Sequence, residues 1–508
     1  MAADMDDVIL GCYEKAIILE DIHMKKQNTI CWRAGIDVTL AVCFIYMVSR
    51  LTELYEHPII IQIAMVAALL GCCLYIWRKK PDEKKICTIL IIMGIVMRIG
   101  YMLYTGCEER QHDLWDLDKS GYGHAAYLLT LIEDRHLPET NQVQMYQQPM
   151  FYFLGAGISG FINWILGSKE AYFLVDAAKT VSCAASCICL LLCRRIGILC
   201  GLREKEMKYA LMLTAFLPAF YIAGGTISPD ALVAMFMLLA FALTLQWFKD
   251  PGWLNTVLLA VVYGLGVLTK ISCGVVALMT AILFVWKFIT QIKAGIKTAG
   301  MLVCKYVVFG LIALPLGLWY SVRNYLLFGQ PLNYVLPISE DSWLYRGNCS
   351  VVERLFLVQI SNFFSTPYVD LNTDYNAPAY YLKSSLFNEF RYDVPGWIPV
   401  VLLMCAAICA AACLVALIWQ IMRNRKDFYC SIVAGMSVLY YASILFFYLQ
   451  YPFACSMDFR YMLFLVIPLS ILLGKYIQYH EKTAAWIRTG LWGLAVSSCV
   501  MYVLAAHR

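Results

Sequence analysis

Apolar runs of about 20 residues recur from one end of this 508-residue chain to the other. A helix of that length crosses about 30 Å of hydrocarbon, the thickness of a bilayer core. Hydrophobic residue types make up 61% of the sequence and charged residues only 15%. Soluble domains carry about 25% charged residues. The sequence therefore predicts an all-α polytopic membrane protein and excludes a soluble globular domain.

Thirteen transmembrane helices are predicted from these runs. The predicted spans cover residues 32–50, 58–77, 86–105, 173–193, 207–224, 229–248, 253–270, 272–290, 301–322, 395–421, 429–449, 459–478 and 485–505. A further apolar stretch, residues 149–166, is either a fourteenth span or a helix that lies on the membrane surface.

Positively charged loops choose between these alternatives, because cytoplasmic loops of membrane proteins are enriched in Lys and Arg. If residues 149–166 cross the membrane, the basic segment 193–208 and several later ones would lie outside the cytoplasm. If residues 149–166 stay at the outer surface, the later basic loops all lie inside, namely 193–208, 291–305, 422–427 and 475–483. We therefore interpret residues 149–166 as a juxtamembrane helix beginning at Pro149, a favourable first helical residue.

This topology predicts a cytoplasmic N-terminal segment, residues 1–31, and two large extracytoplasmic loops, residues 106–172 and 323–394. Because the basic residues lie in short loops beside spans, the net charge of +5 reports topology and does not indicate a nucleic-acid partner.

The first outer loop contains an acid-rich stretch, QHDLWDLDKSGYGHAAYL, at residues 111–128. Asp113, Asp116 and Asp118 are candidate general bases, because a partly buried carboxylate can remove a proton from an acceptor hydroxyl or amine. His112 beside Asp113 could make a hydrogen bond or, with Asp113, hold a divalent metal ion. The competing interpretation is a solvated acidic loop.

Three cations lie at the outer ends of predicted spans. Lys270, Arg323 and Arg460 stand in the motifs LTKISCG, YSVRNYLLFG and MDFRYML. Such side chains suit phosphate oxygens, which Arg often binds through two hydrogen bonds. The competing interpretation is that each side chain extends separately toward lipid headgroups. Three cations on one face beside an acid cluster favour a binding site.

Other polar residues also fall inside or beside apolar segments. Asp230, in TISPDALVAMF, stands at a helix start, where a carboxylate stabilises the helix N-terminus. Asp176 and Lys179 are three residues apart, which predicts a buried ion pair on one helical face. Arg98, near the end of the third span, is a candidate for a further phosphate contact.

The order of these motifs resembles the GT-C superfamily of membrane glycosyltransferases. A span is followed by HD, GHAAYLLTLIEDRHLPE and YQQPMFYFL, and then by PDALVAMFMLLAF, GLGVLTK, RNYLLFGQPL and FRYMLFLVIPL. The resemblance is closest to bacterial members similar to glycosyltransferase family 39, the protein O-mannosyltransferase group. It covers a module at about residues 86–478, and leaves outside it two extra N-terminal spans at 32–85 and a last span with the C-terminus at 479–508.

The resemblance implies transfer of a sugar from a polyprenyl-phosphate carrier to an acceptor outside the cytoplasm, with inversion of the sugar's anomeric centre. The family's base, an acid in the first outer loop, matches Asp113 best. Here His-Asp replaces the commoner Asp-Glu, so Asp116 and Asp118 stay open as alternatives.

The resemblance also assigns the carrier phosphate to Lys270, Arg323 and Arg460. It implies a multi-pass protein of a plasma membrane, the inner membrane in bacteria, with its site on the extracytoplasmic face. The supporting residues expected around the site are His112, His124, Tyr146, Gln148, Asp230 and Asn324.

The acceptor class stays open among lipid, glycan, cell-wall polymer and protein, and the outer loop at 323–394 is expected to shape the acceptor side. Two other functions are alternatives. A flippase or transporter of lipid-linked sugars would carry charges deep within spans and polar clusters on both faces. A non-catalytic scaffold would leave the acids and cations without a common task.

Overall fold

The computed structural model describes residues 32–118, 121–332, 334–358 and 366–505, and this part of the chain is helical and contains no strand. The all-α prediction is confirmed. The predicted cytoplasmic segment 1–31 lies outside the described residues.

Within the described residues, eleven helical segments are long and apolar enough to cross a membrane, or twelve if one bent pair is a single span. The chain is thus a multi-pass membrane protein. The helices of these eleven segments are Trp32–Leu51, α2 (Pro58–Lys79), α3 (Glu83–Tyr104), α6 (Ala171–Asp176) with α7 (Lys179–Leu199), α10 (Asp230–Lys249), η4 (Ile271–Cys273) with α12 (Gly274–Ala294), α13 (Ile296–Phe328), α17 (Trp397–Arg423), α18 (Phe428–Gln450), η5 (Ala454–Met457) and η6 (Phe459–Met462) with α19 (Leu463–Tyr479), and α20 (Ala485–Leu504).

The two remaining predicted spans are helical but atypical. Residues 207–224 correspond to the bent pair α8 (Glu204–Phe216) and α9 (Pro218–Gly225), and residues 253–270 to the 17-residue helix α11 (Trp253–Thr269). All thirteen predicted segments are therefore helices, while the number of crossings stays a prediction.

The bend of 47° between α8 and α9 has a cause in the sequence. Pro218 lacks the N–H that would bond the carbonyl of Thr214. The fully buried Arg98 replaces it, donating to the Thr214 carbonyl at 2.8 Å and to the Ala215 carbonyl at 3.2 Å. The prediction that Arg98 contacts phosphate is wrong, since its guanidinium is occupied inside the bundle.

The predicted Asp176–Lys179 pair is confirmed, with Lys179 Nζ 2.6 Å from Asp176 Oδ1 and both side chains buried. Tyr46 donates to Asp176 Oδ2 at 2.7 Å. This network joins the first described helix, Trp32–Leu51, to the rest of the bundle.

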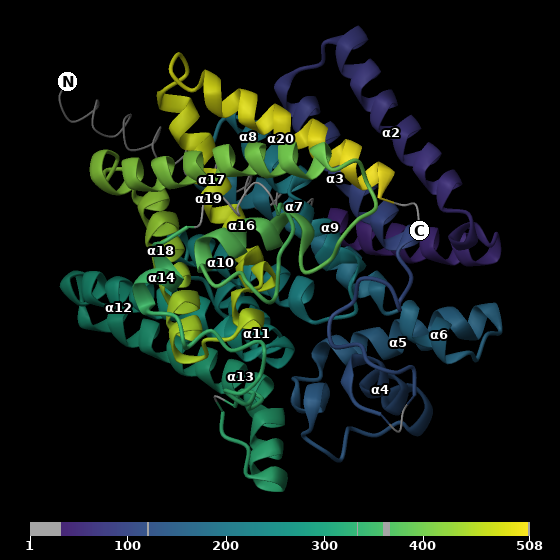
Figure 1. Cartoon of the computed structure of the whole chain (residues 1–508). Helices are drawn as coiled ribbons and strands as arrows, with labels where there is room; N and C mark the ends of the chain where they lie inside the picture. Colours follow the sequence, from purple (N-terminus) through teal and green to yellow (C-terminus); the bar gives the residue numbers. More distant parts are fainter. Residues whose placement is uncertain (1–31, 119–120, 333, 359–365, 506–508) are drawn as a thin grey trace.

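Helices α7, α10 and α19 lie in the interior. α7 packs against α3, α9 and α10, and α19 packs against α8, α17 and α18. α17 lies along α20, and α11 along α13, as Figure 1 shows.

The segments between the long helices form two groups. The first comprises η1 (Leu54–Glu56) after the first helix and then, after α3, α4 (Gly123–Leu129), the π-helical turn η2 (Thr130–Asp134), η3 (Val143–Tyr146) and α5 (Met150–Leu166). α4, α5 and α6 gather at one side of the bundle (Figure 1). The second group, after α13, comprises α14 (Val351–Leu355) and α16 (Ala377–Phe387). The predicted juxtamembrane helix is α5; its position relative to the membrane stays a prediction.

Candidate functional site

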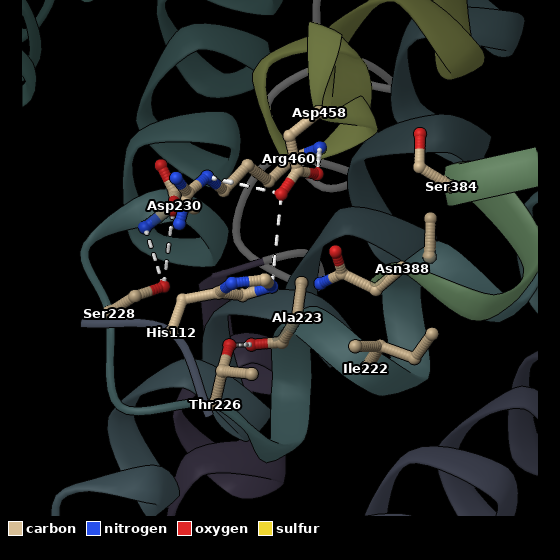
Figure 2. Close-up of a pocket in the computed structure, with 11 residues that line it drawn as sticks. His112, Ile222, Ala223, Thr226, Ser228, Asp230, Ser384, Asn388, Asp458 and Arg460 are labelled. Atoms are coloured by element: carbon tan, nitrogen blue, oxygen red, sulfur yellow. Dashed lines mark hydrogen bonds and ion pairs between the residues drawn. The ribbon is translucent and has the colours of Figure 1, made fainter. Parts of the chain in front are cut away.

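A cluster of charged side chains lies where five chain segments meet, and we call it the polar centre. It comprises His112 and Asp113 after α3, Asp230 at the start of α10, Lys270 after α11, Glu389 after α16, and Asp458 and Arg460 at η6. Figure 2 shows His112, Asp230, Asp458 and Arg460 facing a common space.

Lys270 and Asp230 form one half of this centre. Lys270 Nζ lies 2.5 Å from Asp230 Oδ1, and the Ser228 hydroxyl donates to the other carboxylate oxygen at 3.3 Å. Asp230 is buried, so the cation beside it offsets the cost of holding a carboxylate away from water. The ammonium also lies 4.8 Å from the centre of the Tyr461 ring.

Arg460 links two carboxylates in the other half. Its Nε lies 3.4 Å from Asp458 Oδ2, and its Nη1 lies 3.7 Å from Asp113 Oδ2. The other oxygen of Asp458 accepts a hydrogen bond from the backbone N–H of Arg460 at 2.9 Å. Asp458 thereby caps the N-terminus of the short helix η6, and this holds its carboxylate in place.

His112 lies between two carboxylates. Its Nδ1 is 3.5 Å from Glu389 Oε2 and its Nε2 is 3.7 Å from Asp458 Oδ2, while its ring packs on Phe390. The Tyr380 hydroxyl donates to Glu389 Oε1 at 3.1 Å. Burial raises the pKa of the Glu389 carboxyl above its usual value, against the opposing effect of His112.

Several buried atoms of the polar centre have no hydrogen-bond partner in the part of the chain that the structure describes. They are His112 Nε2, Asp458 Oδ2 and Arg460 Nε. Asp458 Oδ2 lies 3.4 Å from Arg460 Nε, in an ion pair without hydrogen-bond alignment, and 3.7 Å from His112 Nε2. Buried polar groups are nearly always satisfied, so orphaned ones call for a ligand or an ordered water. The three atoms therefore mark a place for an ordered water or for a polar group of a ligand.

A small cavity of about 20 Å³ lies between these side chains, enough for one or two water molecules. Its polar lining comes from the segment after α3, the turn between α9 and α10, the start of α10, the end of α16 and η6. Ala219, Ile222 and Ala223 of α9 supply an apolar wall, and Figure 2 labels the last two. The polar lining residues are His112, Thr226, Ser228, Asp230, Ser384, Asn388, Asp458 and Arg460.

A large apolar groove adjoins the polar centre. Its volume is about 550 Å³, and its walls come mainly from α16, α17, α18 and α19. Phe459 and Met462 line the groove, and Phe459 stands between the two charged residues of η6. The Phe459 N–H donates to the hydroxyl of Ser384, which lines the polar cavity, at 3.2 Å. Groove and polar cavity thus meet at η6.

Arg323 lies apart from the polar cavity and supports the first loop. It donates to the Pro138 carbonyl at 2.8 Å and to the Asn324 side chain at 3.0 Å. Asn324 in turn donates to the Tyr146 carbonyl at 3.2 Å. Burial raises the pKa of Tyr146 to about 12. The structure therefore brings together Lys270 and Arg460 of the three predicted cations, while Arg323 fixes the segment 138–146.

Gln148 and His124 are also buried, and both make hydrogen bonds inside the protein. Gln148 donates to the Ser321 hydroxyl at 2.8 Å. His124 Nδ1 lies 2.6 Å from the Tyr152 hydroxyl, and burial lowers the pKa of this histidine to about 4, so it is neutral near pH 7.

The three candidate bases are not equivalent. Asp113 lies beside Arg460 and is partly exposed, whereas Asp116 and Asp118 are exposed on the loop. None of the three lines the small polar cavity. Asp113 has a positive φ of 53°, and its carbonyl accepts the His124 N–H at 3.0 Å, which fixes the backbone at this residue.

Among the described residues, no three His, Cys, Asp or Glu side chains are grouped so that they could hold a metal ion. His112 and Asp113, the two residues considered for a divalent metal ion, are thus not joined by a third such side chain among the described residues.

Sequence reasoning missed Glu389 and gave Asp458 no role. Glu389 follows His112 by 277 positions, and nothing in the surrounding LFNEFRYD distinguishes it from the other acids of the second loop. Asp458 stands in the motif MDFRYML, in which the sequence analysis assigned only Arg460 to the site, as a phosphate ligand. Only the fold shows that both acids face one histidine.

No family model matches the sequence, and no curated protein does. Two similar solved structures are of Archaeoglobus fulgidus proteins. One is the archaeal oligosaccharyltransferase AglB in complex with an inhibitory peptide and a dolichol-phosphate, at 13% identity, a TM-score of 0.45, and coverage of 84% of this chain and 56% of that one. The other is an oligosaccharyltransferase in the apo form, at 11% identity, a TM-score of 0.46, and coverage of 85% and 57%. The chain thus spans just over half the length of these proteins.

Proposed function

We propose that this protein is a membrane glycosyltransferase that moves a sugar from a polyprenyl-phosphate carrier to an acceptor outside the cytoplasm. The observation that supports the proposal most is the meeting of two features at η6. Cations and carboxylates form a polar centre there, and an apolar groove opens beside it. A lipid-linked sugar phosphate has the same two parts, a charged head and a long apolar tail.

In this proposal the carrier phosphate binds near Arg460, with Lys270 as the second cation. The buried Nε of Arg460 lies 3.4 Å from Asp458 Oδ2 but makes no hydrogen bond among the described residues, so a phosphate oxygen would satisfy it. The polyprenyl tail lies in the groove of α16, α17, α18 and α19.

Asp113 is the proposed base, and the hydrogen bond from the His124 N–H to its carbonyl fixes its backbone. It takes the proton from the acceptor hydroxyl or amine, whose lone pair forms the new bond to the anomeric carbon. The bond from that carbon to the phosphate oxygen breaks, and its electron pair stays on the phosphate. Arg460 stabilises the charge that develops there, because a fixed cation needs no reorganisation during the reaction. Attack opposite the leaving phosphate inverts the anomeric centre. The sugar then lies between Asp113 and Arg460, so their 3.7 Å contact must open when the donor binds.

The catalytic module, the acceptor side and the membrane are assigned from the order of the sequence motifs, which resembles that of GT-C glycosyltransferases. The module at residues 86–478 is the catalytic part, similar to glycosyltransferase family 39, and the loop at 323–394 forms the acceptor side. The protein is placed in a plasma membrane, the inner membrane of a bacterium, with its polar centre on the outer face. Arg323, together with Asn324, Tyr146 and Gln148, positions the first outer loop.

A reconstituted assay tests the proposal. The purified protein in lipid vesicles receives radiolabelled polyprenyl-phosphate sugars of several kinds together with lipid, glycan and peptide acceptors. Release of polyprenyl phosphate with label on an acceptor is the expected result. Movement of intact donor across the bilayer without release would identify a flippase instead. If neither transfer nor movement occurred, the non-catalytic scaffold would be the remaining interpretation.

A further inference from the structure

A second polar cavity lies in the loop after α13 and opens to the surface. Its volume is about 320 Å³, within the range of about 300–1,000 Å³ of small-molecule sites. We call this cavity the outer cleft. Its lining includes Trp343, Asp370, Asn372, Glu389 and Arg391.

The outer cleft is held open by a buried arginine. Arg346 is 7% exposed and donates to the Trp343 carbonyl at 2.8 Å on one wall. On the other wall it donates to the carbonyl of Leu371, and behind this wall to the Asp374 carbonyl at 3.1 Å. A nearly buried Lys383 fixes Asp374 at 3.1 Å. Both walls are thus positioned before any ligand arrives, which lowers the entropic cost of binding.

The groups inside the outer cleft suit a sugar. The Trp343 side chain is 59% exposed although its backbone is fixed, so the indole offers a flat apolar face that folding does not use. Asp370, Asn372 and Arg391 line the same cleft, and their carboxylate, amide and guanidinium groups include both acceptors and donors for hydroxyl groups. One Asp370 oxygen already accepts the Asn372 N–H at 2.9 Å. One apolar platform with polar groups at its rim matches the apolar face and hydroxyl edge of a saccharide.

Glu389 connects the outer cleft to the polar centre. Glu389 is one of the residues that line the cleft, and its carboxylate lies 3.5 Å from His112. The neighbouring residue Asn388 lines the small central cavity. A hydroxyl bound at Glu389 would therefore lie at the boundary between the outer loop and the proposed reaction site.

We propose that the outer cleft binds the sugar of a saccharide acceptor, with Trp343 under its apolar face and Glu389 at the hydroxyl nearest the polar centre. This inference rests on the proposed function and narrows its acceptor to glycan-bearing molecules. It assigns Trp343, Asn372 and Arg391 to acceptor binding and leaves the donor to Arg460 and the groove.

The test measures binding without any donor. The full-length protein in detergent is applied to a printed array of neutral and anionic oligosaccharides and of peptides, and the strongest saccharide is then titrated by calorimetry. The wild type is expected to bind at least one saccharide, Trp343→Ala to bind it at least tenfold more weakly, and Trp343→Phe to keep most of the affinity. Trp397→Ala, at another exposed tryptophan, is the matched control and should bind as the wild type does.

Three results would overturn the inference: no saccharide bound by the wild type, an affinity unchanged in Trp343→Ala, or binding of peptides alone. A melting temperature of Trp343→Ala equal to the wild type's excludes misfolding, and Asn372→Ala supplies a second, smaller change on the same surface. Because the array contains no donor, saccharide binding without donor turnover would refute the proposed function and leave the cleft assignment standing. Donor turnover with no saccharide binding would do the reverse.

Discussion

Asp113 and Asp116 are three positions apart, yet only Asp113 lies beside a cation of the polar centre. If Asp113 is the base, Asp113→Asn should lower the rate of sugar transfer by about 10²–10⁴-fold, the usual contribution of general base catalysis. Asp116→Asn is the control and should keep the wild-type rate. Turnover of radiolabelled donor measures both. Equal losses, or a loss in Asp116→Asn alone, would move the base along the loop.

Arg460 and Arg323 carry the same side chain in different surroundings. Arg460→Gln should raise the donor KM by about 10–100-fold, because a hydrogen bond to a charged group contributes about 1.5–3 kcal/mol. Arg323→Gln should leave the donor KM nearly unchanged, since its guanidinium bonds Pro138 and Asn324. Saturation curves with increasing donor separate the two. A similar rise in both variants would restore the three-cation site predicted from the sequence.

Glu389 links stability to pH. Burial raises its pKa above the usual value, so the native state holds its proton to a higher pH than the unfolded state does. Stability from this residue is therefore largest at low pH and falls as pH rises through the native pKa. Glu389→Gln has no such dependence, so its melting temperature should fall less than the wild type's between pH 5 and pH 8. Thermal unfolding followed by circular dichroism at both pH values gives the comparison. Parallel curves would assign the pH dependence to other groups.

The sequence predicted the residue types of the site better than their grouping. The loop acids and helix-end cations could be found because a charge beside an apolar span is rare and therefore noticeable. That Lys270 pairs with Asp230 while Arg323 bonds the Pro138 carbonyl depends on how the helices pack, and nothing in the local sequence distinguishes the two cations. Glu389 was missed for the same reason.

At the scale of elements, the apolar runs predicted all thirteen helical segments, because segment length and composition are local properties. The break between α8 and α9 was not predicted. It depends on Pro218 together with Arg98, which comes from another helix. The Thr226–Asp230 turn that follows α9 lines the polar cavity, so the break positions part of the site.

The partnership of Arg98 with Pro218 gives a prediction about stability. Arg98→Met leaves the Thr214 and Ala215 carbonyls without donors, at a cost of about 1–3 kcal/mol for each buried group. The melting temperature should fall clearly. Pro218→Ala returns a backbone N–H that can bond the Thr214 carbonyl, so the double variant should be more stable than Arg98→Met alone. Melting temperatures of the four proteins in one detergent provide the measurement. If Pro218→Ala lowered stability equally in both backgrounds, Arg98 would not compensate for the proline.

At the scale of the whole molecule, the apolar groove and the polar centre meet at η6. If the proposed function is right, this arrangement predicts how the rate of sugar transfer depends on the length of the carrier. Ala442 lines the groove, so Ala442→Trp should fill part of the space that a polyprenyl tail would occupy. Burial of apolar surface contributes about 25 cal/mol per Å², so excluding several isoprene units should raise the KM of a long-chain donor by an order of magnitude or more. A donor with a two-isoprene tail should be much less affected, because its phosphate and sugar still reach Arg460 and Asp113. Competition between the two donors in one reaction measures the ratio directly, and Val496→Trp, at an exposed position of α20 outside the groove, is the control. An unchanged preference in Ala442→Trp would place the tail elsewhere on the bundle, and the polar centre would then have to bind a head group delivered from another side.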